Sequence, residues 1–156
     1  MMVLEQAALL STDPITRFAA LCHDLGKGLT PAEKLPGHPG HEKTGVPLVK
    51  TFCRRLKTPT DYERLAEIAC EYHLHLHRLE TLKPKTIVKL LEKTDAFRKP
   101  DRFKQFLQVC EADYRGRAGF ENRDYPQAEL MKQALEACNN IKPQALIAKG
   151  FTGKKL

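Results

Sequence analysis

A histidine and an aspartate stand side by side at His23 and Asp24, within the segment 21–28, LCHDLGKG. A neutral imidazole and a carboxylate near a helix end offer mixed nitrogen and oxygen ligation, which suits a divalent cation of intermediate hardness. Adjacent helical positions point about 100° apart, so both reach one ion only if it lies off the helix flank and other helices complete its coordination. The alternative is a core histidine beside a helix-end carboxylate. The apolar run before the pair and the glycines flanking Lys27, a cation suited to an anion, favour a functional site.

Three further histidines alternate at His73, His75 and His77. In a helix, His73 and His77 are four residues apart and share a face, whereas His75 points away from both. A shared face suits a metal or phosphate pocket, and the alternative is a set of surface histidines at a helix end. His41 begins a helical segment and is a candidate for contacting phosphate or supporting a metal ligand. His38 lies in a loop rich in proline and glycine and is interpreted as a loop residue.

The elements that must position these residues are consecutive helices. Asp13 directly before Pro14 is a helix start signal, and proline or glycine occupies the later breaks. Strand-like alternation is nowhere sustained. The sequence therefore predicts an all-α fold, a compact multi-helix bundle of about seven helices. Apolar residues recur at helical spacing within the segments 3–8, 15–22, 46–56, 65–72, 86–97, 102–114 and 127–138.

The composition is that of a globular domain. Its 156 residues are 42% hydrophobic and 29% charged, which excludes wholesale disorder. No apolar run approaches the roughly 18–20 residues of a membrane helix, and no basic segment opens the chain, so we expect no membrane contact and no secretory signal. Five cysteines without a C-x-x-C pair indicate buried thiols in a reducing cytoplasm. The net charge of +7 allows a polyanionic partner without proving one.

The run ALCHDLGK at 20–27 resembles the HDxGK run of the HD superfamily of metal-dependent phosphohydrolases, whose members are all-α. The wider chain is similar to the HD domain of the bacterial CCA-adding tRNA nucleotidyltransferases of the multifunctional, gammaproteobacterial type. That similarity covers essentially the whole chain. The segments that carry it are RFAALCHDLGK at 17–27 with TP at 30–31, PGHPGHE at 36–42, TDAFRKP at 94–100 and EADYRGR at 111–117.

Two departures from that family are visible. The family's polymerase domain has no counterpart here, so we do not expect this chain alone to add CCA. No histidine precedes His23, so the isolated first histidine of the HD signature is missing. We therefore expect an excised fragment with weakened metal binding, in which 1–142 form the HD phosphohydrolase domain and 143–156 begin a truncated C-terminal tail.

The resemblance implies three metal ligands, namely His23, Asp24 and a late aspartate. Asp95 is preferred for the late ligand because an Asp followed by a small residue and then an Arg near a helix end is the family's usual context. Asp113 competes for the same role from an equally motif-rich segment. For either aspartate, the alternative is a solvated or salt-bridged helix carboxylate.

The resemblance also implies catalytic and substrate roles. The catalytic candidates are Asp24, Lys27, His73 and His41. The candidates for substrate binding are Lys27, His73, His77 and Arg98. Lys27 and His73 would steady phosphoryl oxygens, and His73 or His41 would move a proton. The divalent metal is expected to be nickel, with magnesium as a weaker option.

The implied activities are 2′,3′-cyclic phosphodiesterase, 2′-nucleotidase and phosphatase. The expected partners are nucleotide 2′- or 2′,3′-cyclic phosphates, tRNA in a full-length enzyme of 3′-end maturation and repair, and a second copy in a homodimer. The alternative is a non-catalytic helical module that positions tRNA or dimerises for a polymerase domain elsewhere. A set of cationic residues forms either a surface that binds nucleic acid or a solvated basic face. Its members are Arg98, Lys99, Arg102, Lys104, Arg115, Arg117 and Arg123.

Overall fold

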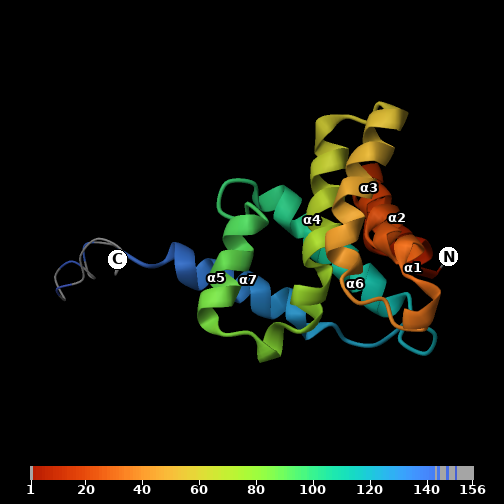
Figure 1. Ribbon diagram of the computed structural model, residues 1–156. Helices are drawn as coiled ribbons and strands as arrows, with labels where there is room; N and C mark the ends of the chain where they lie inside the picture. Colours follow the sequence, from red (N-terminus) through yellow and green to blue (C-terminus); the bar gives the residue numbers. More distant parts are fainter. Residues whose placement is uncertain (1, 143, 145–146, 148–149, 151–156) are drawn as a thin grey trace.

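The chain folds into helices joined by short loops (Figure 1). The computed structural model describes residues 2–142, 144, 147 and 150, and within them there are seven α-helices and no strand. The predicted all-α fold of about seven helices is confirmed. The predicted tail at 143–156 lies almost wholly outside the described residues. The helices are α1 (Met2–Leu10), α2 (Pro14–Cys22), α3 (His41–Leu56), α4 (Thr60–His77), α5 (Pro84–Lys93), α6 (Pro100–Arg115) and α7 (Pro126–Asn139).

Local sequence explains where several helices begin. The side chain of Asp13 accepts a 2.8 Å hydrogen bond from the backbone N–H of Ile15, which caps α2. The helices α5, α6 and α7 each begin with a proline, whose fixed φ suits the first helical position and whose missing N–H needs no partner there. The position at which each helix begins determines where its later side chains, including those of the candidate site, lie along it.

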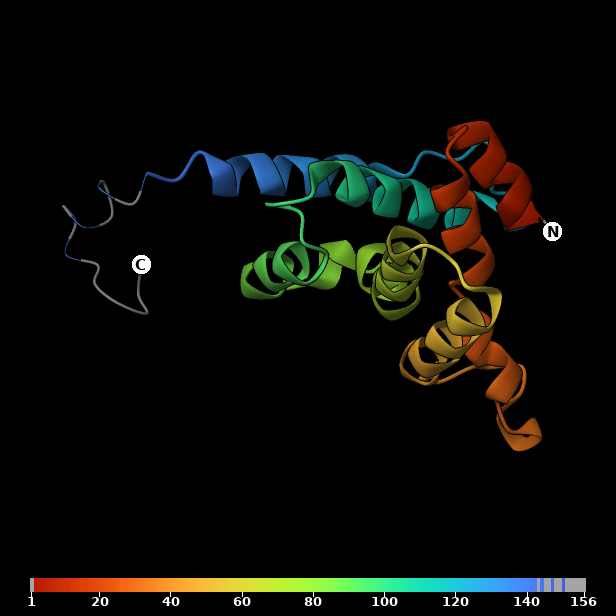
Figure 2. The same ribbon diagram turned by 90° about the horizontal axis from the view of Figure 1, so that it is seen from above.

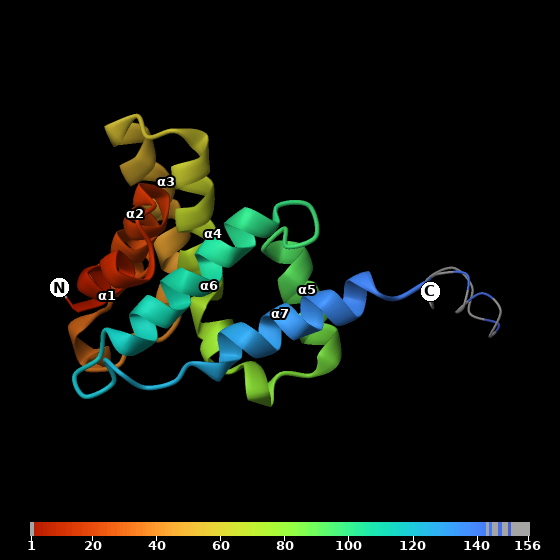
Figure 3. The ribbon, with the colours of Figure 1, turned by 180° about the vertical axis from the view of Figure 1, so that it is seen from behind.

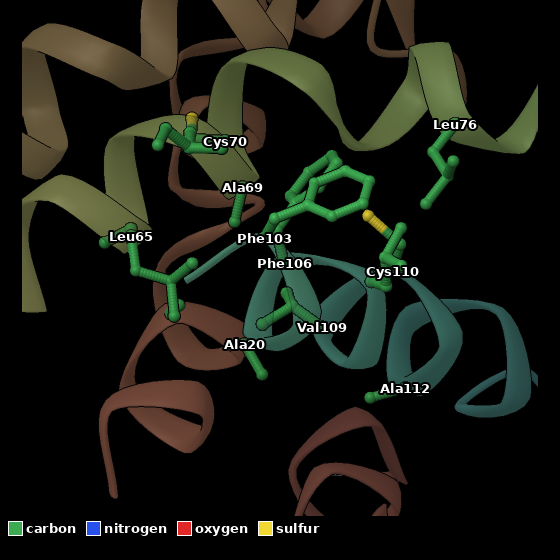
Figure 4. Close-up of a cluster of buried hydrophobic side chains, with 14 of the residues drawn as sticks. Ala20, Leu65, Ala69, Cys70, Leu76, Phe103, Phe106, Val109, Cys110 and Ala112 are labelled. Atoms are coloured by element: carbon green, nitrogen blue, oxygen red, sulfur yellow. The ribbon is translucent and has the colours of Figure 1, made fainter. Parts of the chain in front are cut away.

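The helix α4 lies at the centre and packs against α2, α3 and α6. Figure 4 shows Phe103, Phe106 and Val109 of α6 among side chains of α4 such as Leu65, and all four are buried. All five cysteines are free thiols and four of them are buried, as the sequence predicts. The core therefore fixes α4 and α6 against each other, and both carry residues of the candidate site.

The remaining helices extend this centre on both sides. Figure 2 shows α6 and α7 in succession along one side of the molecule, with α4 and α5 beneath them. Figure 3 shows α6 running across α4, from the α5–α6 turn to the N-terminal helices α1 and α2, which contact it. The two ends of α6 therefore have different neighbours. Within the described residues, none of the helices has the length and hydropathy that crossing a membrane requires.

Two glycines let α3 approach the turn that follows α2. That turn is a 3-10 helix, η1 (Leu25–Leu29). A Cβ atom on Gly26 would overlap the backbone carbonyl of His41 and lie 2.8 Å from the backbone nitrogen of Gly45. On the other side, a Cβ on Gly45 would lie 3.1 Å from the nitrogen of Gly26. This close backbone contact brings the start of α3 beside Asp24.

Candidate metal centre

Five polar side chains converge where α2, α3, α4 and α6 meet. They are His23 at the end of α2, Asp24 at the start of η1, His41 at the start of α3, His73 on α4 and Asp113 on α6. Four of them are buried. Asp24 is the exception, with a side chain that is 25% exposed. The cluster is therefore enclosed on most sides and opens to solvent beside Asp24.

The ligating atoms of this five-residue cluster lie close together. The Nε2 atom of His23 is 3.1 Å from Oδ2 of Asp24 and 3.3 Å from Oδ1 of Asp113. The Nε2 atom of His41 is 3.1 Å from Oδ1 of Asp24 and 3.3 Å from Nε2 of His73. Two triads, His23–His73–Asp113 and Asp24–His41–His73, each have their ligating atoms within 4.8 Å of one another. Nitrogen and oxygen donors thus surround one small volume.

The backbone orients all three imidazoles in the same way. The Nδ1 atoms of His23, His41 and His73 lie 2.7, 2.7 and 2.9 Å from carbonyl oxygens of the preceding turn or loop. A carbonyl only accepts hydrogen bonds, so each Nδ1 carries the proton and, in the neutral ring, each Nε2 presents a lone pair. Three Nε2 atoms and two carboxylates therefore face one another, an arrangement that a cation bound in place of any Nε2 proton stabilises.

Two of the inward-facing atoms have no hydrogen-bond partner. The Nε2 atom of His23 and the Oδ1 atom of Asp24 are both buried and both unsatisfied. Buried polar atoms are nearly always paired, so an orphaned donor set of this kind fits a bound ion. Imidazole nitrogens combined with carboxylate oxygens also have the chemistry of a transition-metal site.

The charges of the cluster are strongly coupled. Burial acts to lower the pKa of His23, but its pairing with Asp113 and Asp24 outweighs burial and raises that pKa to about 10. Burial lowers the pKa of His73 to about 4, and the positive charge of His23 acts in the same direction. Burial acts to raise the pKa of the Asp24 and Asp113 carboxyls, but their pairing with neighbouring positive groups, His23 above all, holds both pKa values well below the usual range. Without a metal, His23 therefore carries the proton of the cluster.

Asp95 does not join this cluster. Its carboxylate oxygens accept hydrogen bonds from Nε of Arg98 at 2.6 Å and from a terminal nitrogen of Arg102 at 2.7 Å. It precedes α6, whereas Asp113 lies near the opposite end of that helix. At 1.5 Å per residue, the 13 residues from the start of α6 to Asp113 span about 20 Å. The preference for Asp95 as the late ligand is therefore corrected, and Asp113 is the aspartate beside His23.

Two of the expected substrate-binding residues contact other protein groups in the structure. The side chain of Arg98 is 82% exposed and pairs with Asp95, far along α6 from the cluster. The ring of His77 is 6.0 Å from that of His73, as their shared helix face predicts, but both its nitrogens contact protein groups. The substrate-binding roles expected for Arg98 and His77 therefore stay predictions, and the structure places Arg98 far from the cluster. His75 points to solvent, as its spacing predicts.

Lys27 does lie at the cluster. Its Nζ atom is 2.5 Å from Oδ2 of Asp24, on the side where the cluster opens. A hollow of about 580 Å³ adjoins this opening, and its polar lining residues include Lys27, His38, His41 and Arg78. Hollows of this size hold small-molecule ligands in many proteins. The position of Lys27 therefore agrees with contact to an anion in the hollow.

Most of the cationic set is engaged within the protein. Arg98 and Arg102 pair with Asp95 and Arg115 pairs with Glu111, whereas Arg123 lies over the ring of Phe120, 3.9 Å from its centroid. These four of the seven cations in this set therefore have partners within the described part of the chain.

Comparisons with known proteins agree with the helical fold and the His–Asp pair. Residues 1–97 match the family model described as HD domain. Two relatives carry the name Multifunctional CCA protein: that of Hahella chejuensis is 53% identical over 156 residues and that of Thioalkalivibrio sulfidiphilus is 51% identical over 156 residues. In both cases the match covers the whole of this chain, but it spans only 37% and 38% of the relatives' lengths. A third, from Haemophilus influenzae, is 48% identical and covers 97% of this chain and 38% of the relative. No solved structure matches the chain.

Proposed function

This chain belongs to the HD-domain family, and from that premise we propose that its five-residue cluster binds one divalent cation and hydrolyses phosphate esters. The observation that carries the proposal is the orphaned, inward-facing donor set, in which the Nε2 of His23 and the Oδ1 of Asp24 lack partners. The proposed ligands are His23, Asp24, His41, His73 and Asp113. The two triads share His73, whose Nδ1 is held by the backbone, so its single free nitrogen supports one ion and not two.

Nickel is our favoured ion, with magnesium as a weaker option. Three imidazole nitrogens suit nickel and its neighbours in the transition series, whereas magnesium prefers oxygen ligands and retains water. Five donors are present in the cluster, so we expect a stoichiometric site and not the weakened one that the sequence suggests. When bound, such an ion polarises a phosphoryl oxygen and lowers the pKa of its water toward neutrality.

The side chains around the cluster have distinct roles in this proposal. His73 is buried and its pKa is lowered to about 4, which supports a role as a neutral ligand rather than a proton carrier or a substrate contact. Lys27 lies at the opening, where an ammonium group stabilises the negative charge that spreads over phosphoryl oxygens. His41 lines both the cluster and the hollow, so it is the histidine best placed to contact the substrate.

The proposed substrates are nucleotide 2′- or 2′,3′-cyclic phosphates held in the adjoining hollow. The corresponding activities are 2′,3′-cyclic phosphodiesterase, 2′-nucleotidase and phosphatase. The name shared by the relatives, Multifunctional CCA protein, supports a role for this domain in the maturation or repair of the tRNA 3′ end. A second candidate, a helical module that positions tRNA without catalysis, is supported by the net charge of +7.

One experiment separates these two functions. Loss of a group that hydrogen-bonds a metal ligand typically lowers activity roughly 10–100-fold. Because Asp24 is itself a proposed ligand, the variant Asp24→Ala should hydrolyse 2′,3′-cyclic AMP with added Ni²⁺ more slowly still. The matched control Asp101→Ala, at an exposed position on α6, should keep full activity. Equal hydrolysis of the cyclic phosphodiester by Asp24→Ala and the wild type would exclude this cluster as the site of a hydrolase. A salt-dependent tRNA mobility shift that survives Asp24→Ala would then support the module.

The affinity for Ni²⁺ should depend on pH. His23 has a pKa of about 10 in the metal-free protein, so below that pH an ion must displace its proton. We expect the affinity to rise about tenfold per pH unit between pH 6.5 and 8.5, with about one proton released per ion. Calorimetry in buffers of different ionisation enthalpy measures that proton. The variant His75→Ala, at an exposed position of α4, should show the same slope, and a flat profile in the wild type would remove His23 from the ligand set.

A further inference from the structure

We propose that Tyr125 positions the metal-binding carboxylate of Asp113 through His77. This inference rests on the proposed metal site and assigns His77 and Tyr125 a role in it that is neither ligation nor substrate binding. The Nε2 atom of His77 is 2.7 Å from Oδ2 of Asp113, and the hydroxyl of Tyr125 is 2.9 Å from Nδ1 of His77. The other oxygen of Asp113, Oδ1, faces Nε2 of His23 at 3.3 Å.

The direction of both hydrogen bonds follows from the chemistry of the groups. An ionised carboxylate only accepts, so the Nε2–H of His77 donates to Asp113. In the neutral ring the Nδ1 atom of His77 is then an acceptor, and the hydroxyl of Tyr125 must donate to it. Burial raises the pKa of Tyr125, so this hydroxyl keeps its proton. The chain of donors therefore runs from Tyr125 to Asp113 and leaves Oδ1 free to face a cation.

Tyr125 is held firmly in this position. It is 6% exposed, and its ring lies 5.1 Å from that of Tyr114 and 5.7 Å from that of His77. It also directly precedes Pro126, and a residue before proline has a restricted backbone. Arg117 is the other group near Oδ2 of Asp113, but it lies 3.9 Å away with a side chain that is 53% exposed. The short, buried contact to His77 is therefore the one that can hold the carboxylate.

Two observations separate this arrangement from a general feature of the family. Asp113 and Tyr125 both lie beyond residues 1–97, the part of the chain that matches the HD-domain model. For their partner His77, the family resemblance implies a different role, the binding of substrate. Metal-ligating groups are commonly oriented by such outer hydrogen bonds, and losing one typically costs about 10–100-fold in metal affinity.

The test compares two tyrosines of the same aromatic cluster. The variant Tyr125→Phe removes only the hydroxyl and should weaken Ni²⁺ binding about tenfold or more in calorimetry. The control Tyr114→Phe makes the same chemical change on a neighbouring ring, whose hydroxyl makes no hydrogen bond in the described part of the chain. It should bind Ni²⁺ within about twofold of the wild type. Circular dichroism melts in EDTA show that both variants are folded.

Changes at His77 test whether Tyr125 acts through it. The variant His77→Leu should lose affinity, whereas His77→Gln, which can present an amide N–H to Asp113, should recover part of it. Adding Tyr125→Phe to His77→Leu should cause no further loss, because the two residues act in series. The visible spectrum of bound Co²⁺ should change in Tyr125→Phe and not in Tyr114→Phe.

Each remaining outcome overturns a different claim. If folded Tyr125→Phe binds Ni²⁺ as tightly as the wild type, or if the losses at Tyr125 and His77 simply add, the positioning role is wrong while the metal site stands. If the wild-type chain itself takes up no Ni²⁺, the proposed metal site fails and this inference fails with it.

Discussion

The variant Asp113→Ala will lose stoichiometric Ni²⁺ binding, whereas Asp95→Ala will keep it. Asp113 places an oxygen 3.3 Å from Nε2 of His23 and belongs to one of the two triads of the cluster. Removing a proposed ligand should lower the affinity for Ni²⁺ by more than the roughly 10–100-fold that follows when a hydrogen-bond partner of a ligand is removed. Calorimetric titration of both variants with Ni²⁺ measures this difference.

Asp95→Ala should instead affect stability. Its carboxylate pairs with Arg98, which is largely exposed, and with Arg102, whose side chain is 15% exposed. Because solvent screens ion pairs of this kind, they contribute little to stability, and we expect the Tm to fall by no more than roughly 2–4 °C without loss of metal binding. The opposite result, with binding lost in Asp95→Ala and kept in Asp113→Ala, would return the late ligand to Asp95.

The variant Gly26→Ala will destabilise the fold and the cluster together. An added Cβ would overlap the carbonyl of His41 and press on the nitrogen of Gly45, and both are backbone atoms that cannot rotate away. Overpacking of a buried contact commonly costs about 1–3 kcal/mol, and we expect a loss at the upper end of that range or beyond it. Relief of the clash would move the start of α3, and His41 with it, away from Asp24.

The matched control for this prediction is Gly28→Ala, two residues later in the same turn. A Cβ on Gly28 would meet nothing within 4 Å. Its free energy of unfolding, from urea titration followed by circular dichroism, should stay within about 0.5 kcal/mol of the wild type. Equal stability of Gly26→Ala and Gly28→Ala would show that the approach of α3 to η1 is looser than these distances imply.

Much of the fold follows from local sequence. Helical spacing of apolar residues and the prolines at Pro84, Pro100 and Pro126 indicate where helices run and where three of them begin. The apolar stripes mark the helix ends less well. The helix α4 begins five residues before its stripe, and the segment 86–97 runs four residues past the end of α5. In α3 the stripe begins at Val46, whereas the helix begins at His41, as the sequence predicts, because its first turn is polar and carries no apolar stripe. That turn is where α3 contributes to the cluster.

Part of the site was also accessible from the sequence. His23 and Asp24 are adjacent, and the chain leaves the helix between them, since Asp24 has φ −110° and ψ 12°. That bend lets the two neighbours face each other. His73 and His77 share a helix face because of their spacing, and the structure keeps their rings 6.0 Å apart. Within one segment, covalent geometry is enough to predict such pairs.

Only the tertiary structure shows which aspartate lies in the cluster and which groups His77 contacts. Periodicity states which residues share a face of one helix, but it does not state where along that helix a second one crosses it. The packing of α6 against α2 brings Asp113 to His23, and its packing against α4 brings Asp113 to His77, whose remaining nitrogen contacts Tyr125. Asp95 precedes the start of α6 and meets two arginines instead. The amino-acid sequence determined the helices and the His–Asp pair, and packing between helices distant in the chain determined their partners.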